Sequence, residues 1–248
     1  MPLQPLLQPF DSGKLAPRVG SVILPHGETI DDAAARALIE NAAAADFDLV
    51  WIEASRKLET TLLDDRGTIV ELHGDRDTAL SKVRLVALRY DVRELESEAD
   101  WATLEELMRF APTSRFASDP HIPQASFRRH KLSLLQAHVQ NRDGLVSFAH
   151  PTGDATRAVG YHCTSLDADR NVVFYDLAVD PEFRRGFVAL NLISYNLERV
   201  AATHPDARRL TVRIYDDNIA SLRLFANLGL EPTGRQFHYY HCWPKDTH

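Results

Sequence analysis

Residues 172–193 read VVFYDLAVDPEFRRGFVALNLI, and this stretch decides the fold. Residues 172–179 are β-branched, aromatic or aliphatic except for Asp176, which is typical of a strand buried on both faces. Pro181 follows the strand and ends it, because proline has no backbone N–H to donate. From Val188 onward, apolar residues recur at a spacing near 3.6 and predict a helix. The sequence therefore predicts a strand, a short turn and a helix in succession.

The turn contains Arg184, Arg185 and Gly186 and is basic. A helix N-terminus presents N–H groups that have no acceptor within the helix, together with the positive end of the helix dipole. Such a position suits a phosphate or pyrophosphate group. The alternative interpretation is that the two arginines are solvated surface charges.

These residues resemble the acetyl-CoA-binding signature of the GCN5-related N-acetyltransferase (GNAT) superfamily. Residues 210–230 read LTVRIYDDNIASLRLFANLGL and are similar to the closing motif of that family, N-x-x-A-x-x-L-Y-x-x-x-G-F. The residues at matching positions are Asn218, Leu224, Phe225, Gly229 and Leu230. The resemblance implies an α/β fold with a mixed, mostly antiparallel sheet, a splayed central strand and flanking helices. It also implies transfer of an acetyl group from acetyl-CoA, as co-substrate, to a primary amine, without a metal.

In the resembled family, pantetheine pairs with the backbone of the splayed strand, and the CoA pyrophosphate lies on the following helix N-terminus. The residues that this implies for cofactor binding are Leu177, Ala178, Val179, Arg184, Arg185, Gly186, Phe187, Val188, Ala189, Asn218 and Phe225.

Two phenylalanines depart from the family pattern. In an ungapped alignment Phe187 stands at the first glycine of the family turn, R/Q-x-x-G-x-G/A; a one-residue deletion would place Gly186 there instead. A phenylalanine ring there crowds phosphate oxygens unless it points away. Phe225 stands where many members carry a tyrosine that protonates the departing thiolate. Both departures support a second hypothesis, a binding or regulatory module that kept the fold and lost the chemistry.

Attack on a thioester requires a neutral amine, so we expect a base or a water relay to one. Relatives often place a carboxylate on the splayed strand, at the position of Val173 or Tyr175, and neither residue is acidic here. Asp176 lies on the opposite face from Tyr175, where we expect an ion pair or a helix contact. His162, on the preceding strand, is a candidate base because imidazole titrates near neutrality.

Because phenylalanine has no proton to donate, another residue would have to protonate the departing thiolate, and the terminal strand contains candidates. Alternation along that strand places Tyr239 and His241 on one face and His238 and Tyr240 on the other. The residues that we single out as catalytic candidates are His162, Tyr175 and Tyr240.

Composition is that of an ordinary globular protein, with 44% hydrophobic and 25% charged residues among 248. The net charge of −7 argues against nucleic acid or an anionic membrane as the main partner. The two cysteines have no metal-binding spacing and imply no disulfide framework. No apolar run approaches 18 residues and the N-terminus has no signal-peptide pattern, so we expect a cytoplasmic protein. The oligomeric state is left open, with a homodimer among the candidates.

The chain is expected to divide near residue 95. A smaller α/β domain is predicted over 1–95, with an extended arm over 1–18, and the acetyltransferase domain over 96–248. Within the first domain, the patterns predict strands at 19–25, 47–54, 68–74 and 82–92, helices at 29–46 and 55–65, and a turn at 75–81. Helices at 97–110 and 124–140 and a strand pair near 144–149 and 157–166 lead to the quoted stretch.

A short loop motif narrows the expected acceptor. Ser114, Arg115 and Phe116, with Asp119-Pro120, resemble the loop of the dTDP-fucosamine (dTDP-4-amino-4,6-dideoxygalactose) N-acetyltransferases, as does the two-part layout. The resemblance implies a nucleotide-linked amino sugar as small-molecule substrate, with Arg115 and Phe116 as substrate-binding residues. Arg115 could hold a diphosphate, or it could pair with Asp119 and only shape the loop. A longer acyl donor, or an amino-acid or peptide amine, is a further alternative.

Overall fold

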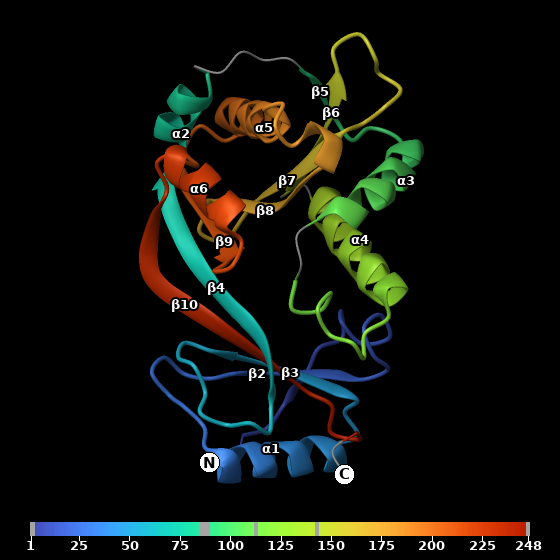
Figure 1. Cartoon of the computed structure of the whole chain (residues 1–248), viewed down its shortest axis with the longest axis vertical. Helices are drawn as coiled ribbons and strands as arrows, with labels where there is room; N and C mark the ends of the chain where they lie inside the picture. Colours follow the sequence, from blue (N-terminus) through green and yellow to red (C-terminus); the bar gives the residue numbers. More distant parts are fainter. Residues whose placement is uncertain (1–2, 85–89, 112–113, 142–143, 247–248) are drawn as a thin grey trace. The chain divides into compact units, whose positions relative to one another are not determined.

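The computed structural model describes residues 3–84, 90–111, 114–141 and 144–246 (Figure 1). The chain packs into two compact units. The first holds Met1–Val70, Thr113–His130 and Gly234–His248, and the second holds Glu71–Pro112 and Lys131–Thr233. The units interleave along the chain, whereas the sequence suggested a single boundary near residue 95.

The first unit is a small α/β sheet. Its elements are β1 (Leu6–Leu7), β2 (Val19–Ile23), α1 (Asp32–Ala44), β3 (Leu49–Ala54) and parts of β4 (Asp64–Asp75) and β10 (Glu231–Cys242). The strand order is β1-β2-β3-β10-β4. Strands β2 and β3 are parallel, and β10 runs antiparallel to β3.

Helix α1 forms where the alanine-rich segment predicts it. The carboxylate of Asp31 accepts a hydrogen bond from the Ala34 N–H at 2.8 Å and caps the helix. Leu38 and the small residues Ala35 and Ala42 are buried. They belong to the same core as Tyr240 of β10, so α1 covers one face of this sheet.

Two expectations for the first unit were wrong. The predicted helix at 55–65 does not form, because backbone and side chains there bond to distant partners. The Leu58 N–H donates to the Tyr240 hydroxyl, and the Thr60 hydroxyl donates to Asp32. The predicted extended arm is packed as well: Leu15 is buried in a core cluster with Leu49.

The second unit contains most of the helices. Its strands are β5 (Tyr90–Glu94), β6 (Gly144–Pro151), β7 (Gly160–Leu166), β8 (Val172–Val179) and β9 (Arg209–Tyr215). Its helices are α2 (Arg76–Val83), α3 (Glu98–Leu107), α5 (Val188–Thr203) and α6 (Ile219–Asn227), with short 3₁₀ helices at Met108–Phe110 and Pro181–Phe183. Helix α4 (Gln124–Gln140) begins in the residues of the first unit and continues into those of the second. The strand order is β4-β9-β8-β7-β6-β5. The pairs β5–β6, β6–β7 and β7–β8 are antiparallel, and β8 is parallel to β9.

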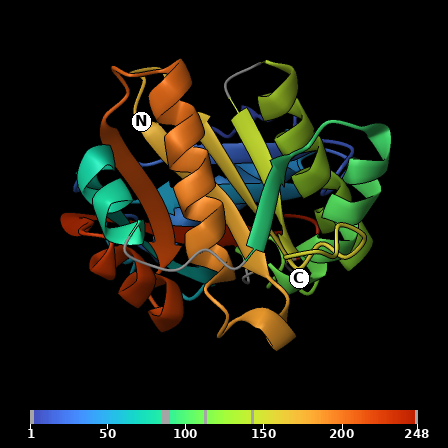
Figure 2. The same ribbon diagram turned by 90° about the horizontal axis from the view of Figure 1, so that it is seen from above.

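Helices cover both faces of β6–β8. Val188 and Leu192 of α5 pack on one face with Ala149 and Val159, and Figure 2 shows α5 lying over these strands. On the other face, α3 and α4 contribute a core cluster that includes Leu104 and Leu135 with residues of β6, β7 and β8. This mixed, mostly antiparallel sheet with flanking helices is the expected fold class.

Residues 75–92 differ from the expectation. The predicted turn at 75–81 is helix α2, capped by Asp75, whose carboxylate accepts from the Thr78 N–H at 2.8 Å. The predicted strand at 82–92 is therefore wrong at its start, and its residues 85–89 lie outside the described residues. Tyr90–Glu94 is a strand as predicted.

The chain is polar on average, with a mean hydropathy of −0.27. Within the described ranges, no helix combines the length and the apolar character that a bilayer span requires.

Arg76 connects α2 to the segment that follows α5. Its side chain is buried, and its Nη1 donates to the carbonyl oxygens of His204 and Ala207, each at 3.1 Å. A guanidinium at a helix C-terminus also stabilises the negative end of the helix dipole. Arg76 thus fixes the connection between α5 and β9.

We expect Arg76→Met to lower the free energy of unfolding by about 2–4 kcal/mol, because buried carbonyl oxygens lose a charged donor. Arg76→Lys should cost less, since it keeps the charge but not the forked geometry. Urea unfolding followed by circular dichroism measures both. Equal stability of all three proteins would contradict the role of Arg76.

Candidate functional site

The pairing of β8 with β9 ends about halfway along β8. Their parallel pairing covers Val172–Phe174 with Leu210–Val212. Beyond Phe174, β8 continues to pair with β7 as far as Val179 and Gly160. Leu177, Ala178 and Val179 therefore have a strand partner on one edge and an edge toward β9 that the described pairing leaves open. This is the splayed central strand that the sequence predicted.

A β-bulge at Tyr175 lies where the strands part. In the register of β7 with β8, Cys163 faces Asp176 and Thr164 faces Phe174, so Tyr175 is the extra residue. A bulge bends its strand and increases the local twist. The Tyr175 ring is 38% exposed and meets the His138 ring edge-on, with centroids 4.5 Å apart.

The basic turn follows directly after β8. The Asp180 carboxylate accepts from the Glu182 N–H at 3.0 Å, and Arg157 bridges Asp180 and Glu182 at 3.2 and 2.8 Å. Arg184 and Arg185 are exposed, and Arg184 Nε donates to the Val179 carbonyl at 3.3 Å. The turn therefore presents two exposed cations beside the first turn of α5.

Phe187 is the N-cap of α5 and has a left-handed backbone, with φ 64° and ψ 15°. A bulky residue seldom adopts this conformation, which suits glycine. Its carbonyl accepts from both the backbone N–H of Asn191, at 3.0 Å, and the Asn191 side-chain amide, at 2.8 Å. The Phe187 ring is 48% exposed. The family glycine position is therefore occupied by a phenylalanine that takes the glycine conformation.

Two glycines allow the close approach around this turn. A Cβ on Gly160 would lie 2.9 Å from the Ala178 carbonyl and 3.0 Å from Val188 Cγ1, so α5 packs directly on β7. A Cβ on Gly186 would lie 2.2 Å from the Tyr90 hydroxyl. The buried Val188 and the half-buried Ala189 then start the helix.

The closing motif lies at the end of the parallel neighbour β9. Asn218 caps α6, with its side-chain oxygen accepting from the Ser221 N–H at 3.2 Å. Because β8 and β9 are parallel, α5 and α6 begin at the same edge of the sheet. Phe225 is 3% exposed and packs on Phe174, with centroids 5.3 Å apart.

His162 is enclosed by the fold. Its ring is fully buried against Phe174, with centroids 5.1 Å apart, and burial lowers the pKa of His162 to about 3. The imidazole is therefore neutral near pH 7 and has no exposed nitrogen.

Asp176 forms an ion pair, as expected. Its carboxylate accepts from Lys131 Nζ at 2.8 Å and from the Tyr161 hydroxyl. Burial, and then the Asp176 charge, raise the pKa of Tyr161 well above its ordinary value. Asp176 thus fastens α4 and β7 to β8.

Tyr240 belongs to the first unit, where it is 2% exposed in the core beneath α1. Its hydroxyl accepts from the Leu58 N–H at 2.8 Å. Of the three catalytic candidates, Tyr175 is the one with an exposed ring.

Arg115 and Phe116 also belong to the first unit. The Arg115 guanidinium carbon lies 4.1 Å from the Tyr239 ring centroid, 4.7 Å from that of Phe116 and 4.8 Å from that of Trp51. Its Nε is buried and has no hydrogen-bond partner among the described residues. Phe116 is buried and stacks on His241.

Asp119 has partners other than Arg115. It accepts hydrogen bonds from His241, from the His121 N–H and from Trp243 Nε1, and Arg66 lies 3.6 Å away. Burial alone would raise the pKa of Asp119, but these bonds hold it below its usual range. The acid that interacts with Arg115 is Asp11: burial alone would raise the pKa of Asp11, but His130, Trp51 and the Arg115 charge hold it below its ordinary value.

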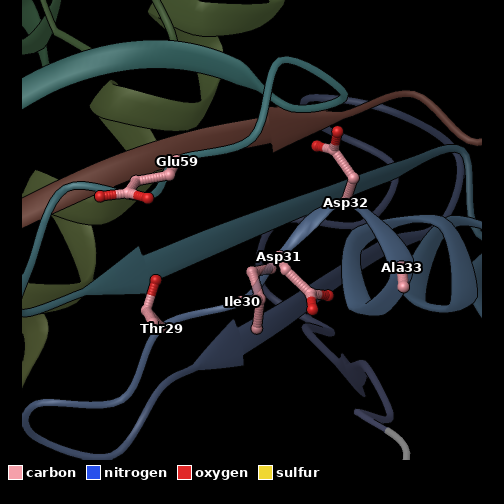
Figure 3. A pocket seen from close by; sticks show the side chains of 6 residues that line it. All are labelled: Thr29, Ile30, Asp31, Asp32, Ala33 and Glu59. Atoms are coloured by element: carbon pink, nitrogen blue, oxygen red, sulfur yellow. The ribbon is translucent and has the colours of Figure 1, made fainter.

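A pocket of about 370 Å³ lies at the N-terminus of α1 (Figure 3). Helix α1 connects the parallel strands β2 and β3 as α5 connects β8 and β9. The carboxylates of Asp31, Asp32 and Glu59 line this pocket. The helix start that is basic in the second unit is therefore acidic in the first, which disfavours an anion there.

Within the described ranges, no three His, Cys, Asp or Glu side chains group as the ligands of a metal ion would.

Sequence reasoning missed Asn191, Tyr90 and Arg157, which hold the turn in place. Asn191 stands four residues after Phe187, a spacing that allows a side chain to reach back to the N-cap carbonyl. Tyr90 lies on β5, and no local signal connects it to Gly186.

We expect Gly186→Ala to destabilise the turn, because its methyl group would meet the Tyr90 hydroxyl. Tyr90→Phe removes that oxygen, so the double variant should recover most of the lost unfolding free energy. A double-mutant cycle in urea measures the coupling. Strictly additive losses would contradict the contact.

His162 should make stability depend on pH. Its pKa is about 3 in the folded protein and about 6.5 when unfolded, so the unfolded chain binds the proton between these values. The stabilisation is present above pH 6.5 and is lost as the pH falls toward 3. Relative to His162→Leu, the wild type should lose up to about 1.4 kcal/mol per pH unit below pH 6. A constant difference between pH 7 and 4.5 would contradict a neutral His162.

Comparisons with known proteins agree with this geometry. A family model described as "Acetyltransferase (GNAT) family" matches residues 101–230, more than half of the chain. No curated protein matches the chain significantly.

Solved structures share the fold. The tandem GNAT protein from the clavulanic acid biosynthesis pathway has a TM-score of 0.63 and 16% identity, over 91% of this chain and 75% of that one. The GCN5-related N-acetyltransferase from Kribbella flavida has a TM-score of 0.55 and 14% identity, over 90% and 80%. At these identities the likeness shows the fold alone. With the family match, the splayed strand and the basic helix start, the chain belongs to the GNAT acetyltransferase family.

Proposed function

We propose that this protein transfers an acetyl group from acetyl-CoA to a primary amine. The observation that carries the proposal is the open edge of β8 followed by a basic turn and the start of α5. The pantetheine amides can pair with the Leu177–Val179 edge. The pyrophosphate can accept from first-turn N–H groups of α5, with Arg184 and Arg185 beside it.

The chemistry is direct transfer. The amine nitrogen attacks the thioester carbon, the C–S bond breaks, and the CoA thiolate leaves. A backbone N–H on the open edge of β8 polarises the carbonyl oxygen, and orientation supplies much of the acceleration. An acyl-enzyme is disfavoured because both cysteines are buried, and burial raises the pKa of Cys242 to about 12.

Proton transfer involves groups other than Phe225. We assign protonation of the leaving thiolate to Tyr175, because this residue lies on the bulge where the edge of β8 opens and is partly exposed. His162 is buried and neutral, so we assign deprotonation of the amine to water. The exposure of the Phe187 ring favours an enzyme over a silent module, which would require rings that fill the ligand sites.

For the acceptor, we propose an amine that carries an anionic group, and a nucleotide-linked amino sugar fits this description. Arg115 supports the proposal, because three rings hold its guanidinium while its Nε has no partner among the described residues. Longer acyl groups and amino-acid amines are the competing substrates in the assay below.

Calorimetric titration with acetyl-CoA tests the proposed function. We expect micromolar binding with one site per chain, because the start of α1 is acidic whereas that of α5 is basic. Release of the CoA thiol then tests transfer, with nucleotide-linked amino sugars, amino-acid amines and simple amines as acceptors and with acetyl-CoA and longer acyl-CoA thioesters as donors. Absence of binding at millimolar ligand would contradict the proposal.

We expect Arg184→Ala and Arg185→Ala, each as a single variant, to weaken acetyl-CoA binding by roughly 10- to 150-fold, since one lost charged hydrogen bond costs about 1.5–3 kcal/mol. Binding of acetyl-pantetheine, which has no pyrophosphate, should not change. Arg170→Ala, at the opposite end of β8, is the matched control. Equal losses for both ligands would refute the assignment of the turn to the pyrophosphate.

A further inference from the structure

Phe187 combines a backbone that suits glycine with a ring that the fold leaves half-exposed. Its φ of 64° is unfavourable for a bulky side chain, and the two hydrogen bonds from Asn191 hold it there. Glycine would adopt this conformation without strain and would leave the turn open for phosphate. The ring is therefore unnecessary for the shape of the turn.

Exposed apolar side chains in the second unit gather on the elements around the open edge of β8. Among the described residues of this unit, the large exposed ones are Tyr175 on β8, Phe187 at the start of α5 and Ile219 at the start of α6. Both helices begin at the carboxyl ends of the parallel strands β8 and β9. A long ligand laid along this edge would cover apolar surface that water otherwise contacts.

Tyr175 lies where the open edge of β8 begins, and Phe187 lies beyond the end of that edge, at the start of α5. Pantetheine on this edge would therefore begin near Tyr175 and run toward the start of α5. The pyrophosphate ends at the first turn of α5. The group beyond it is adenosine, and the side chain at that end of the edge is the Phe187 ring.

We propose that the Phe187 ring stacks on the adenine of the acyl-CoA co-substrate and selects for it. This inference rests on the proposed function. An aromatic ring stacks on any base face, and removal of such a ring costs about 1–3 kcal/mol per base, roughly 5- to 150-fold in affinity. Phe187 is 48% exposed, so the fold leaves part of its side chain open to a ligand. The protein should therefore bind complete CoA thioesters more tightly than thioesters that have no adenosine.

Phe187→Gly tests the ring without disturbing the backbone, because glycine accepts φ 64°. The ligands are acetyl-CoA and S-acetyl-4′-phosphopantetheine, which has no adenosine. We expect Phe187→Gly to weaken acetyl-CoA about tenfold or more and to leave acetyl-phosphopantetheine unchanged. Phe187→Trp should retain the preference for acetyl-CoA, and Phe187→Leu should lose most of it. The midpoint of thermal unfolding should not fall in Phe187→Gly.

The outcomes separate this inference from the proposed function. If the wild type fails to bind acetyl-CoA, the proposed function fails. If the wild type binds and Phe187→Gly binds equally or more tightly, the ring is neutral or an obstruction, and the stacking proposal alone is overturned. Equal losses for the two thioesters, or a lower unfolding midpoint, would assign the ring to the fold of the turn and would also overturn it.

Discussion

Backbone N–H and C=O groups need hydrogen-bond partners, and the second half of β8 has a strand partner on one edge only. The bulge at Tyr175 marks the position where β8 turns away from β9, and the packing of Phe225 on Phe174 fills the space just before it. The helices that follow β8 and β9 begin at the same edge. In the proposed function, the open edge is where the amide groups of pantetheine pair, and the basic turn after it favours an anionic ligand.

The two units share one arrangement of strands and helix but differ in the charge of the side chains at the helix start. Each has a parallel strand pair connected by a helix, β2–α1–β3 in the first and β8–α5–β9 in the second. The first begins its helix among Asp31, Asp32 and Glu59, and the second begins its helix after two arginines. The same arrangement of backbone thus carries acidic side chains at the helix start in one unit and basic side chains in the other. Function follows from the side chains at the helix start.

Sequence periodicity predicted the elements whose hydrogen bonds are local or whose strands are strongly apolar. The β8 strand, the basic turn and α5 formed where the pattern placed them. The helix predicted over 55–65 does not form, because Leu58 bonds to Tyr240 and Thr60 bonds to Asp32, which no local pattern reveals. The geometry of Phe187 could be expected from its glycine position, but the amide of Asn191 that holds it could not. The fold was therefore predictable in outline, and the supports of the candidate site were not.

The pairing of β3 with β10 has a consequence for biosynthesis. Tyr239 donates to Glu53, a residue made 186 positions earlier. At a translation rate of about 5–20 residues per second, β3 is synthesised roughly 10 to 40 s before its partner strand β10. An unpaired apolar strand edge recruits other chains during such an interval. The nascent chain is thus exposed to aggregation at this edge while its second unit is already emerging.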